Sequence, residues 1–221
     1  MSMELSDVVS ALSYVLTELP STLRHLETLT RRSEELERAT LRNRALNFLY
    51  IRHLRLELNF GYLLGADVLD LAFLLQAAPI IEKLEFHMLM CTTLQRYHKC
   101  HSKLRSLPSH RHPHVKLVEI TGFYGQKAQL ELALHILRNS AMLKAMKIHP
   151  KPTFTRVDGP LFMKYGLCFV DGYKVAKKYL RKADHHGVVS VIEVRRRDVE
   201  GVNPYHLVDP YWINALAEDE S

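Results

Sequence analysis

The amino-acid sequence predicts an α/β fold, an irregular solenoid of short parallel strands with intervening helices, and three observations support this prediction. An apolar spacing of the form Φ-x-x-Φ-x-Φ, where Φ is an apolar residue, recurs along the chain, for example at Ile81, Leu84 and Phe86. The middle apolar residues of successive copies are separated by 25 to 46 residues. Apolar residues at helical spacing lie between several of these copies.

The spacing has a physical cause that indicates a leucine-rich-repeat solenoid. The last two apolar residues alternate inward on a strand, and the first turns the chain into the core. A strand that recurs with helices between its copies is typical of such a solenoid. An ordinary βαβ domain with coincidental spacing is the alternative, and both predict parallel strands with right-handed crossovers. The copies are Leu26-x-x-Leu29, Ile51-x-x-Leu54-x-Leu56, Ile81-x-x-Leu84-x-Phe86, Val115-x-x-Val118-x-Ile120, Leu143-x-x-Met146-x-Ile148 and Val189-x-x-Ile192-x-Val194.

Helices and strands alternate in the first half of the chain. Residues 6–20 have helical apolar spacing and end at a proline, and residues 31–46 are polar and predict a connector. Inward and outward residues alternate over 50–60, which predicts a half-buried strand. Residues 65–79 predict a second helix with an aspartate as its possible N-cap and a proline at its end. The strand at 81–88 follows directly.

The second half of the chain continues the alternation after an irregular stretch that is rich in histidine and proline. The loops are predicted from clustered prolines and glycines, the helices from leucine spacing and the strands from β-branched or alternating residues. The predicted order is a loop at 91–114, a strand at 114–123, a helix at 124–139, a strand at 141–150, a loop at 151–166, a helix at 171–184, a strand at 187–197 and an acidic tail at 215–221.

Outward-pointing residues of the strands are the candidate binding residues. In a solenoid of this kind the strands line the concave face, about 4.8 Å apart, so the residues between the inward pairs form a ladder. The ladder is either a solvated row whose charges neutralise one another or a surface for a protein partner. The ladder residues are Thr30, Arg55, Glu85, Glu119, Lys147 and Glu193, and the flanking columns add His53, Glu57, Lys83, His87, Thr121 and His149.

One long run carries a resemblance to a known family. The run HPHVKLVEITGFYGQKAQLELALHILRNSAMLKAMKI resembles the C-terminal region of plant, particularly grass, F-box/leucine-rich-repeat proteins of the FBD type. We expect Gly122 and Gly125 to make its tight strand-to-helix turn. The stretches LRHLRLELNF, AAPIIEKLEFHM and CFVDGYKVAKKYL match the order of the same family, so the resemblance covers most of residues 20–200. The leucines expected to pack its helix on the strands are Leu130, Leu134 and Leu137.

The resemblance and the repeat together predict one domain over residues 1–221. Its expected parts are leucine-rich-repeat-like units at 1–100, the His-rich loop at 101–114, FBD-like terminal units at 115–200 and a tail at 201–221.

The family resemblance also implies a function. Full-length proteins of that family join a cullin-type ubiquitin ligase through an F-box and present substrates on their repeats. The sequence shows no F-box pattern, because YVLTELPSTL shares only fragments of one. The resemblance therefore implies a non-enzymatic recognition module like the substrate-binding half of such a receptor, with an unknown protein partner. The ligase adaptor is not expected to bind this chain directly.

Composition bears on the other function classes. The net charge of +6 permits nucleic-acid binding, which is the main alternative, but no aromatic residues interleave the basic runs. The run Arg195–Arg197 is also followed at once by Asp198 and Glu200. No apolar stretch reaches the roughly 18 residues that a membrane span needs. The three cysteines favour a reduced intracellular setting, cytoplasmic or nuclear.

No pattern in the sequence points to catalysis or to a cofactor. The sequence lacks G-x-S-x-G, P-loop and G-x-G-x-x-G motifs, so an uncharacterised small enzyme stays an alternative without a motif. Cys168 lies between apolar neighbours and is expected to be a buried structural thiol. Histidines and cysteines gather in the irregular loop, but their spacing matches no ordinary zinc site, so we expect a basic loop without metal. These residues are Cys91, His98, Cys100, His101, His110, His112 and His114.

Overall fold

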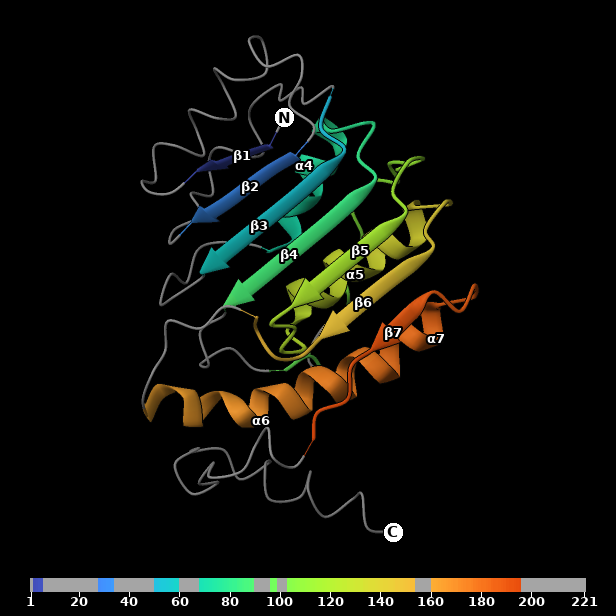
Figure 1. Ribbon diagram of the computed structural model, residues 1–221. Helices are drawn as coiled ribbons and strands as arrows, with labels where there is room; N and C mark the ends of the chain where they lie inside the picture. Colours follow the sequence, from blue (N-terminus) through green and yellow to red (C-terminus); the bar gives the residue numbers. More distant parts are fainter. Residues whose placement is uncertain are drawn as a thin grey trace.

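The computed structural model contains a seven-stranded parallel sheet whose strands follow one another in chain order (Figure 1). Each strand pairs in parallel with the next strand in the sequence, which confirms the predicted repeat architecture. The structure describes residues 2–5, 28–33, 50–59, 68–89, 96–98, 103–153 and 160–195. The strands are β1 (Ser2–Leu5), β2 (Thr28–Ser33), β3 (His53–Asn59), β4 (Lys83–Leu89), β5 (Leu117–Thr121), β6 (Ala145–His149) and β7 (Val189–Val191).

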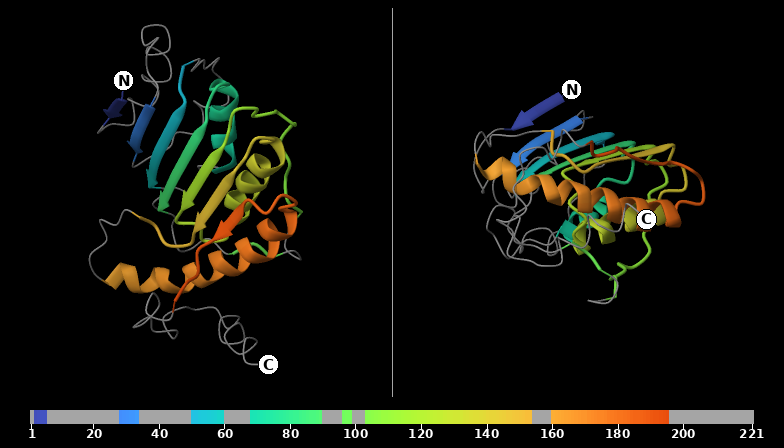
Figure 2. Two further views of the ribbon diagram at one scale, coloured as in Figure 1. Left: turned by 45° about the vertical axis from the view of Figure 1, so that its right-hand side comes forward. Right: turned by 90° about the horizontal axis from the view of Figure 1, so that it is seen from below.

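The described helices lie on one side of the sheet and along its carboxyl end (Figures 1 and 2). α6 runs across the carboxyl ends of β5 and β6 before the chain returns to β7 (Figure 1). The other side carries no helix in the described part of the chain, and we call the outward side chains of β3 to β7 on that side the open face. No described helix is long and apolar enough to cross a membrane. The helical segments are η1 (Val68–Leu71), α4 (Ala72–Ala77), α5 (Lys127–Asn139), α6 (Pro160–Val175), the π-helical η2 (Ala176–Leu180) and α7 (Arg181–Ala183).

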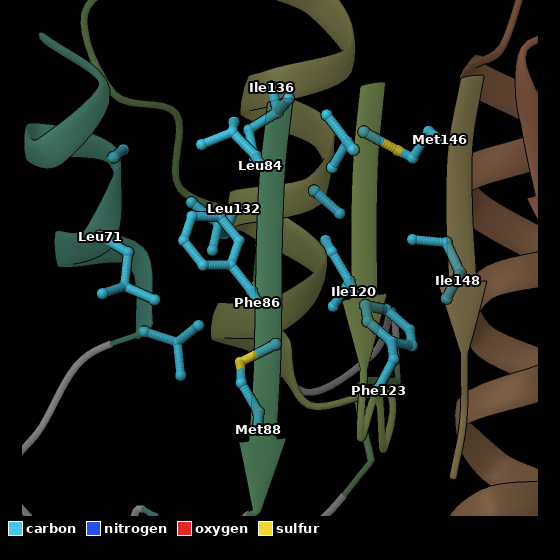
Figure 3. Packing of buried hydrophobic residues seen from close by; sticks show 14 of the residues in the cluster. Leu71, Leu84, Phe86, Met88, Ile120, Phe123, Leu132, Ile136, Met146 and Ile148 are labelled. Carbon is cyan, nitrogen blue, oxygen red and sulfur yellow. The ribbon is translucent and has the colours of Figure 1, made fainter. Parts of the chain in front are cut away.

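The hydrophobic core fills the space between the sheet and the helices. Figure 3 shows Phe86 of β4 on the helix side of the sheet, beside Leu132 of α5. The predicted packing of the α5 leucines on the strands is confirmed, because Leu130 and Leu134 are buried and Leu137 packs against the same core. The first inward row is Leu54, Leu84, Val118 and Met146, and the second is Leu56, Phe86, Ile120 and Ile148.

The predicted register of the last strand is wrong by three residues. Val189 pairs with Met146 and Val191 with Ile148, in the places that the sequence pattern gave to Ile192 and Val194. The cause lies in the turn before β7, where the Asp184 carboxylate accepts hydrogen bonds from the backbone N–H groups of residues 186, 188 and 189. This turn starts the strand early. Since side chains alternate along a strand, an odd shift reverses which ones point inward, and Ile192 is 42% exposed.

Two other elements differ from the prediction. β1 (Ser2–Leu5) was not predicted, and α6 begins at Pro160, inside the stretch 151–166 that the prolines and glycines marked as loop. Proline is tolerated in the first turn of a helix, where its missing N–H has no partner to lose, so Pro160 starts the helix instead of preventing it. The predicted helix at 6–20 lies outside the described residues.

The turn after β5 carries the glycines that the sequence marked. Gly122 and Gly125 both have positive φ angles, of 69° and 78°, which confirms their predicted role in the turn. The buried Gln129 of α5 fixes this turn, since its amide donates to the Gly122 carbonyl at 2.7 Å and accepts from the Tyr124 N–H at 2.9 Å. A Cβ atom on Gly122 would lie 1.8 Å from the carbonyl oxygen of Met88. The close approach of β4 to this turn therefore requires glycine.

Gly122→Ala is expected to destabilise the domain much more than Gly187→Ala. The two glycines have nearly equal φ angles, of 69° and 68°, so the cost of a left-handed alanine, about 1 kcal/mol, is common to both. Only Gly122 faces backbone atoms, since nothing lies within 4 Å of a Cβ on Gly187. Displacing that backbone adds about 2 kcal/mol or more. Urea unfolding of the two variants measures the difference, and equal losses would contradict the close approach.

Candidate functional site

The open face brings together the outward residues that the sequence predicted. Arg55, Glu85, Glu119 and Lys147 lie in one cross-strand row, and each is paired with the next by the sheet register. Thr30 precedes Arg55 in the same row. The flanking residues also occupy their predicted columns, with His53 beside Lys83 and with Glu57, His87, Thr121 and His149 in sequence.

The predicted place of Glu193 in this row is wrong. The register puts Ser190 next to Lys147, and Glu193 lies two residues beyond the end of β7 with an exposed side chain. The physical reason is the turn at Asp184, which shifts the whole strand by three residues. The polar row on the open face therefore ends in a small hydroxyl instead of a carboxylate.

Glu85 is the centre of the charge network on β3 and β4. Its carboxylate accepts from Arg55 Nη1 at 3.1 Å, forms an ion pair with Lys83, and lies 3.2 Å from His53 Nε2. Arg55 uses its other terminal nitrogen on Glu57 at 3.0 Å. Burial by itself raises the pKa of the Glu85 carboxyl, but the hydrogen bond from Lys83 and the charges of Lys83 and His53 bring it down to about 2. Glu85 is therefore ionised, and its charge is already neutralised by its neighbours.

His87 and two threonines close the carboxyl end of the open face. The His87 Nδ1 atom lies 2.9 Å from the hydroxyl oxygen of Thr121 and 2.9 Å from that of Thr153. Thr153 belongs to the segment that leaves β6, and the carbonyl of Lys151 in that segment accepts from the Gly122 N–H at 3.0 Å. The segment 150–153 thus lies over the ends of β4 and β5. His87 and Thr121 are buried as a result and are not available as contact residues.

The outward side chains of β5 and β6 make fewer polar contacts with one another than those of β3 and β4. His149 Nε2 lies 3.3 Å from the Glu119 carboxylate. Lys147 stands opposite Glu119 in the register with an exposed side chain, and its ammonium group forms no ion pair within the described part of the chain. Leu117, on the same side of β5, is 44% exposed. This part of the face therefore presents an ammonium group that forms no ion pair and an apolar side chain.

The three histidines of the open face are neutral at pH 7. Burial lowers the pKa of His53, His87 and His149 below the ordinary histidine value, and it outweighs the nearby carboxylates, which raise it. The positive charges of Lys83 and Lys147 lower the pKa of His53 and His149 further. The open face consequently carries its charge on the arginine, the lysines and the glutamates.

Sequence reasoning missed the polar residues on the outer side of α5. The Glu131 carboxylate is completely buried and accepts from the Arg105 backbone N–H at 2.6 Å and from Arg105 Nε at 2.8 Å. Helical periodicity placed Glu131 on the solvent side of an amphipathic helix. The residues 103–114 cover that side instead, and we call them the strap. Leu104 and Leu107 of the strap also pack against the core, but the prolines and histidines around them predicted a loop.

The strap is also held by histidines that were predicted to lie in a loose basic loop. His112 is 3% exposed, its Nε2 atom lies 3.4 Å from Nε2 of His135 on α5, and its backbone N–H donates to the Asn139 carbonyl at 2.8 Å. The ring of His110 lies 5.4 Å from that of His112. Burial and the charges of His135 and His110 lower the pKa of His112 to about 4. The described part of this loop is therefore a packed structural element.

Metal ligation finds no support among the residues that the structure describes. No group of three or more histidine, cysteine, aspartate or glutamate residues in those ranges is arranged to hold a metal ion. Cys91, Cys100 and His101 lie outside the described residues. The thiol side chain of Cys168 lies partly buried against the core.

Glu85→Gln is expected to lower the free energy of unfolding by about 1–2 kcal/mol at pH 7. The neutral amide leaves Lys83 and Arg55 without their shared counter-charge in a partly buried site, and the partial exposure of these partners keeps the cost below that of a fully buried pair. Glu193→Gln, at an exposed position outside the row, is the matched control and should change little. Urea unfolding tests this, and equal effects of the two variants would contradict the central role of Glu85.

The domain is expected to lose stability as the pH falls from about 6.5 to about 4, in part through His112. The native state disfavours protonation of His112, so the unfolded chain binds more protons in that window and its free energy falls relative to the native state. Above pH 6.5 this contribution is fully present. His112→Gln should flatten the pH dependence of the urea midpoint, whereas His114→Gln, at an exposed strap position, should leave it unchanged. Parallel curves for His112→Gln and wild type would refute this role.

Comparison with known protein families supports the repeat architecture. The family model described as the At1g61320/AtMIF1 LRR domain matches residues 1–191, which is most of the chain. No curated protein and no solved structure matches the chain. Leucine-rich-repeat domains serve protein interaction through the surface that their strands form, which favours a binding role over a catalytic one. The FBD type and the F-box connection are not part of this match and stay predictions. The in-order parallel sheet and the family match together show that the chain belongs to the At1g61320/AtMIF1 family of leucine-rich-repeat domains.

Proposed function

We propose that the domain binds a protein partner through the open face of its sheet. The observation that carries this proposal is that polar and charged side chains gather in register on a sheet face without a described helix, while the opposite face is packed against helices. The open face includes Lys83 and Lys147, whose side chains both reach solvent. A rigid row of this kind offers charge complementarity and little cost of ordering on binding.

The rigidity of the face comes from its internal ion pairs. Glu85 holds Lys83 and Arg55, and Arg55 also holds Glu57, so these side chains are fixed before a partner arrives. Groups that are already paired contribute shape and specificity more than net affinity. Groups without such pairing, above all Lys147, are the ones whose charge a partner can neutralise.

We further propose that the partner is a protein destined for ubiquitination, as the resemblance to F-box/leucine-rich-repeat receptors implies. In this role the domain supplies the substrate-binding half, and an F-box acts with it in the complete receptor. The support for this role is the sequence similarity of residues 112–148, in which the turn glycines and the α5 leucines take the expected positions. Purified domain should therefore fail to bind the ligase adaptor in a direct pulldown.

Partner binding should depend on the open face and not on the basic helical side of the domain. The face variant His53→Ala, Lys83→Ala, Lys147→Ala removes one histidine and two lysines from the open face. A matched control removes His185, Arg181 and Lys182, which are exposed near α7. In affinity purification with mass spectrometry, we expect the face variant to lose the proteins that wild type and control both retain.

Two outcomes of this comparison would overturn the proposal. The first is retention of every wild-type partner by the face variant. The second is a loss limited to the control variant, which would move binding to the basic residues around α7. Thermal unfolding of both variants is measured alongside, so that a loss of binding is read only from folded protein.

A further inference from the structure

One part of the open face has its charged groups engaged in contacts within the protein, and another part is accessible to a partner. On β3 and β4 the charged groups are bound to one another around Glu85, and at the carboxyl end the segment 150–153 covers His87. On β5 and β6, Leu117 and Lys147 are both exposed. Leu117 pairs in register with Ala145, which carries only a methyl group, and Glu119 pairs with Lys147. We call Leu117, Ala145 and Lys147 the β5–β6 patch.

Lys147 is the charged residue of this face that lacks a partner in the described part of the chain. The carboxylates on the face are all engaged, since Glu57 contacts Arg55, Glu85 contacts Lys83, and Glu119 contacts His149. The positive charges of Arg55, Lys83 and Lys147 equal in number the negative charges of Glu57, Glu85 and Glu119, and the ammonium group of Lys147 is the one left available to a ligand. Ser190, opposite Lys147 on β7, is exposed and places a hydroxyl on the side away from Glu119. An ammonium group and a hydroxyl group side by side can both donate hydrogen bonds to a carboxylate.

The surroundings of the patch have the same sign. The described segment 140–153, which contains β6, holds three lysines and no aspartate or glutamate. This end of the domain therefore attracts acidic partners over a distance set by the Debye length, about 8–10 Å at physiological salt.

The separation of Leu117 and Lys147 indicates how far apart the two residues of the partner that contact them should lie. Leu117 and Lys147 are diagonal neighbours, one strand and two residues apart, which corresponds to about 8 Å between their Cα atoms. In an extended peptide, residues i and i+2 point to the same side and lie about 6.6–6.8 Å apart. The geometry points to an extended segment of the partner protein with one apolar and one acidic residue two positions apart, bound at the β5–β6 patch. This inference rests on the proposed function and specifies the partner's chemistry.

A phage library of random dodecamer peptides, selected on the purified domain, is the first test. We expect enrichment of peptides with a large apolar residue and an aspartate or glutamate at i and i+2. The most enriched peptide is then synthesised with a fluorescent label, and its affinity is measured by anisotropy at low and at physiological salt. Because an exposed lysine carries the charge contact, the affinity should fall as salt is added.

Four single variants with matched positions then locate the site. Lys147→Glu should weaken binding of the labelled peptide about fivefold or more, and Leu117→Ser about threefold or more. Lys144→Glu is the charge control at an exposed position just before β6. Ile192→Ser is the apolar control at an exposed position just after β7. Both controls should stay within about twofold of wild type.

The possible outcomes separate this inference from the proposed function. Selected peptides that lack the apolar–acidic pair, or that respond to His53→Glu but not to Lys147→Glu, would overturn the inference while the open face remained the binding surface. A failure to enrich any peptide also overturns it, and the affinity purification described above then decides the function by itself. Displacement of the peptide by a 20-nucleotide single-stranded DNA, with tighter DNA than peptide binding, would replace the acidic segment by nucleic acid as the ligand.

Discussion

The in-register stacking of the parallel strands is the constraint on which the rest of the structure depends. Because Leu54, Leu84, Val118 and Met146 occupy one buried row, the residues that follow each of them must point to the other side of the sheet. The same register that buries the core therefore assembles the open face. A shift of one residue in any strand would bury its charged residues and expose its apolar ones.

The register also explains why the charges of the face are arranged as they are. Arg55 meets Glu85, and Glu119 meets Lys147, because opposite charges occupy equivalent positions in adjacent repeats. Opposite charges that face each other across strands are favourable, and like charges are not. Glu85 and Glu119 are the exception, since they stand side by side in β4 and β5. Each of them has another neighbour, since Glu85 forms an ion pair with Lys83 of its own strand and the Glu119 carboxylate lies 3.3 Å from His149 Nε2 of β6.

Much of this arrangement could be predicted from the sequence because the apolar spacing of each repeat marks which strand residues point inward and which point outward. The spacing around Leu54, Leu84, Val118 and Met146 fixed both the strands and their relative register, and with them the neighbours of Arg55 and Lys147. The register of the last strand escaped prediction because its β-branched run allows two registers, and the choice between them is made by the backbone N–H groups that donate hydrogen bonds to the Asp184 carboxylate. Such a choice depends on the turn before the strand and not on the apolar pattern.

The polar contacts outside the repeat could not be predicted for a different reason. Glu131 and His135 lie at positions of α5 that helical periodicity assigns to solvent, and they are buried by the strap, which the sequence predicted to be a loop. Their partners Arg105 and His112 are 26 and 23 residues away in the sequence. Polar side chains give no signal of such pairing until the fold brings them together. The repeat therefore predicted the residues of the open face, whereas the contacts between the strap and α5 could not be predicted from it.

The contacts that skip repeats have a consequence for how the domain unfolds. In a solenoid, neighbouring units interact mainly with each other, so that one end can in principle unravel while the other stays folded. Here Arg96 binds Asp171 across 75 residues, and His87 meets Thr153 across 66 residues. These ties join the middle of the sheet to the segments that follow β6, so fraying of the last repeats breaks contacts of the central ones. The middle and the carboxyl-terminal part of the array are therefore coupled into one cooperative unit.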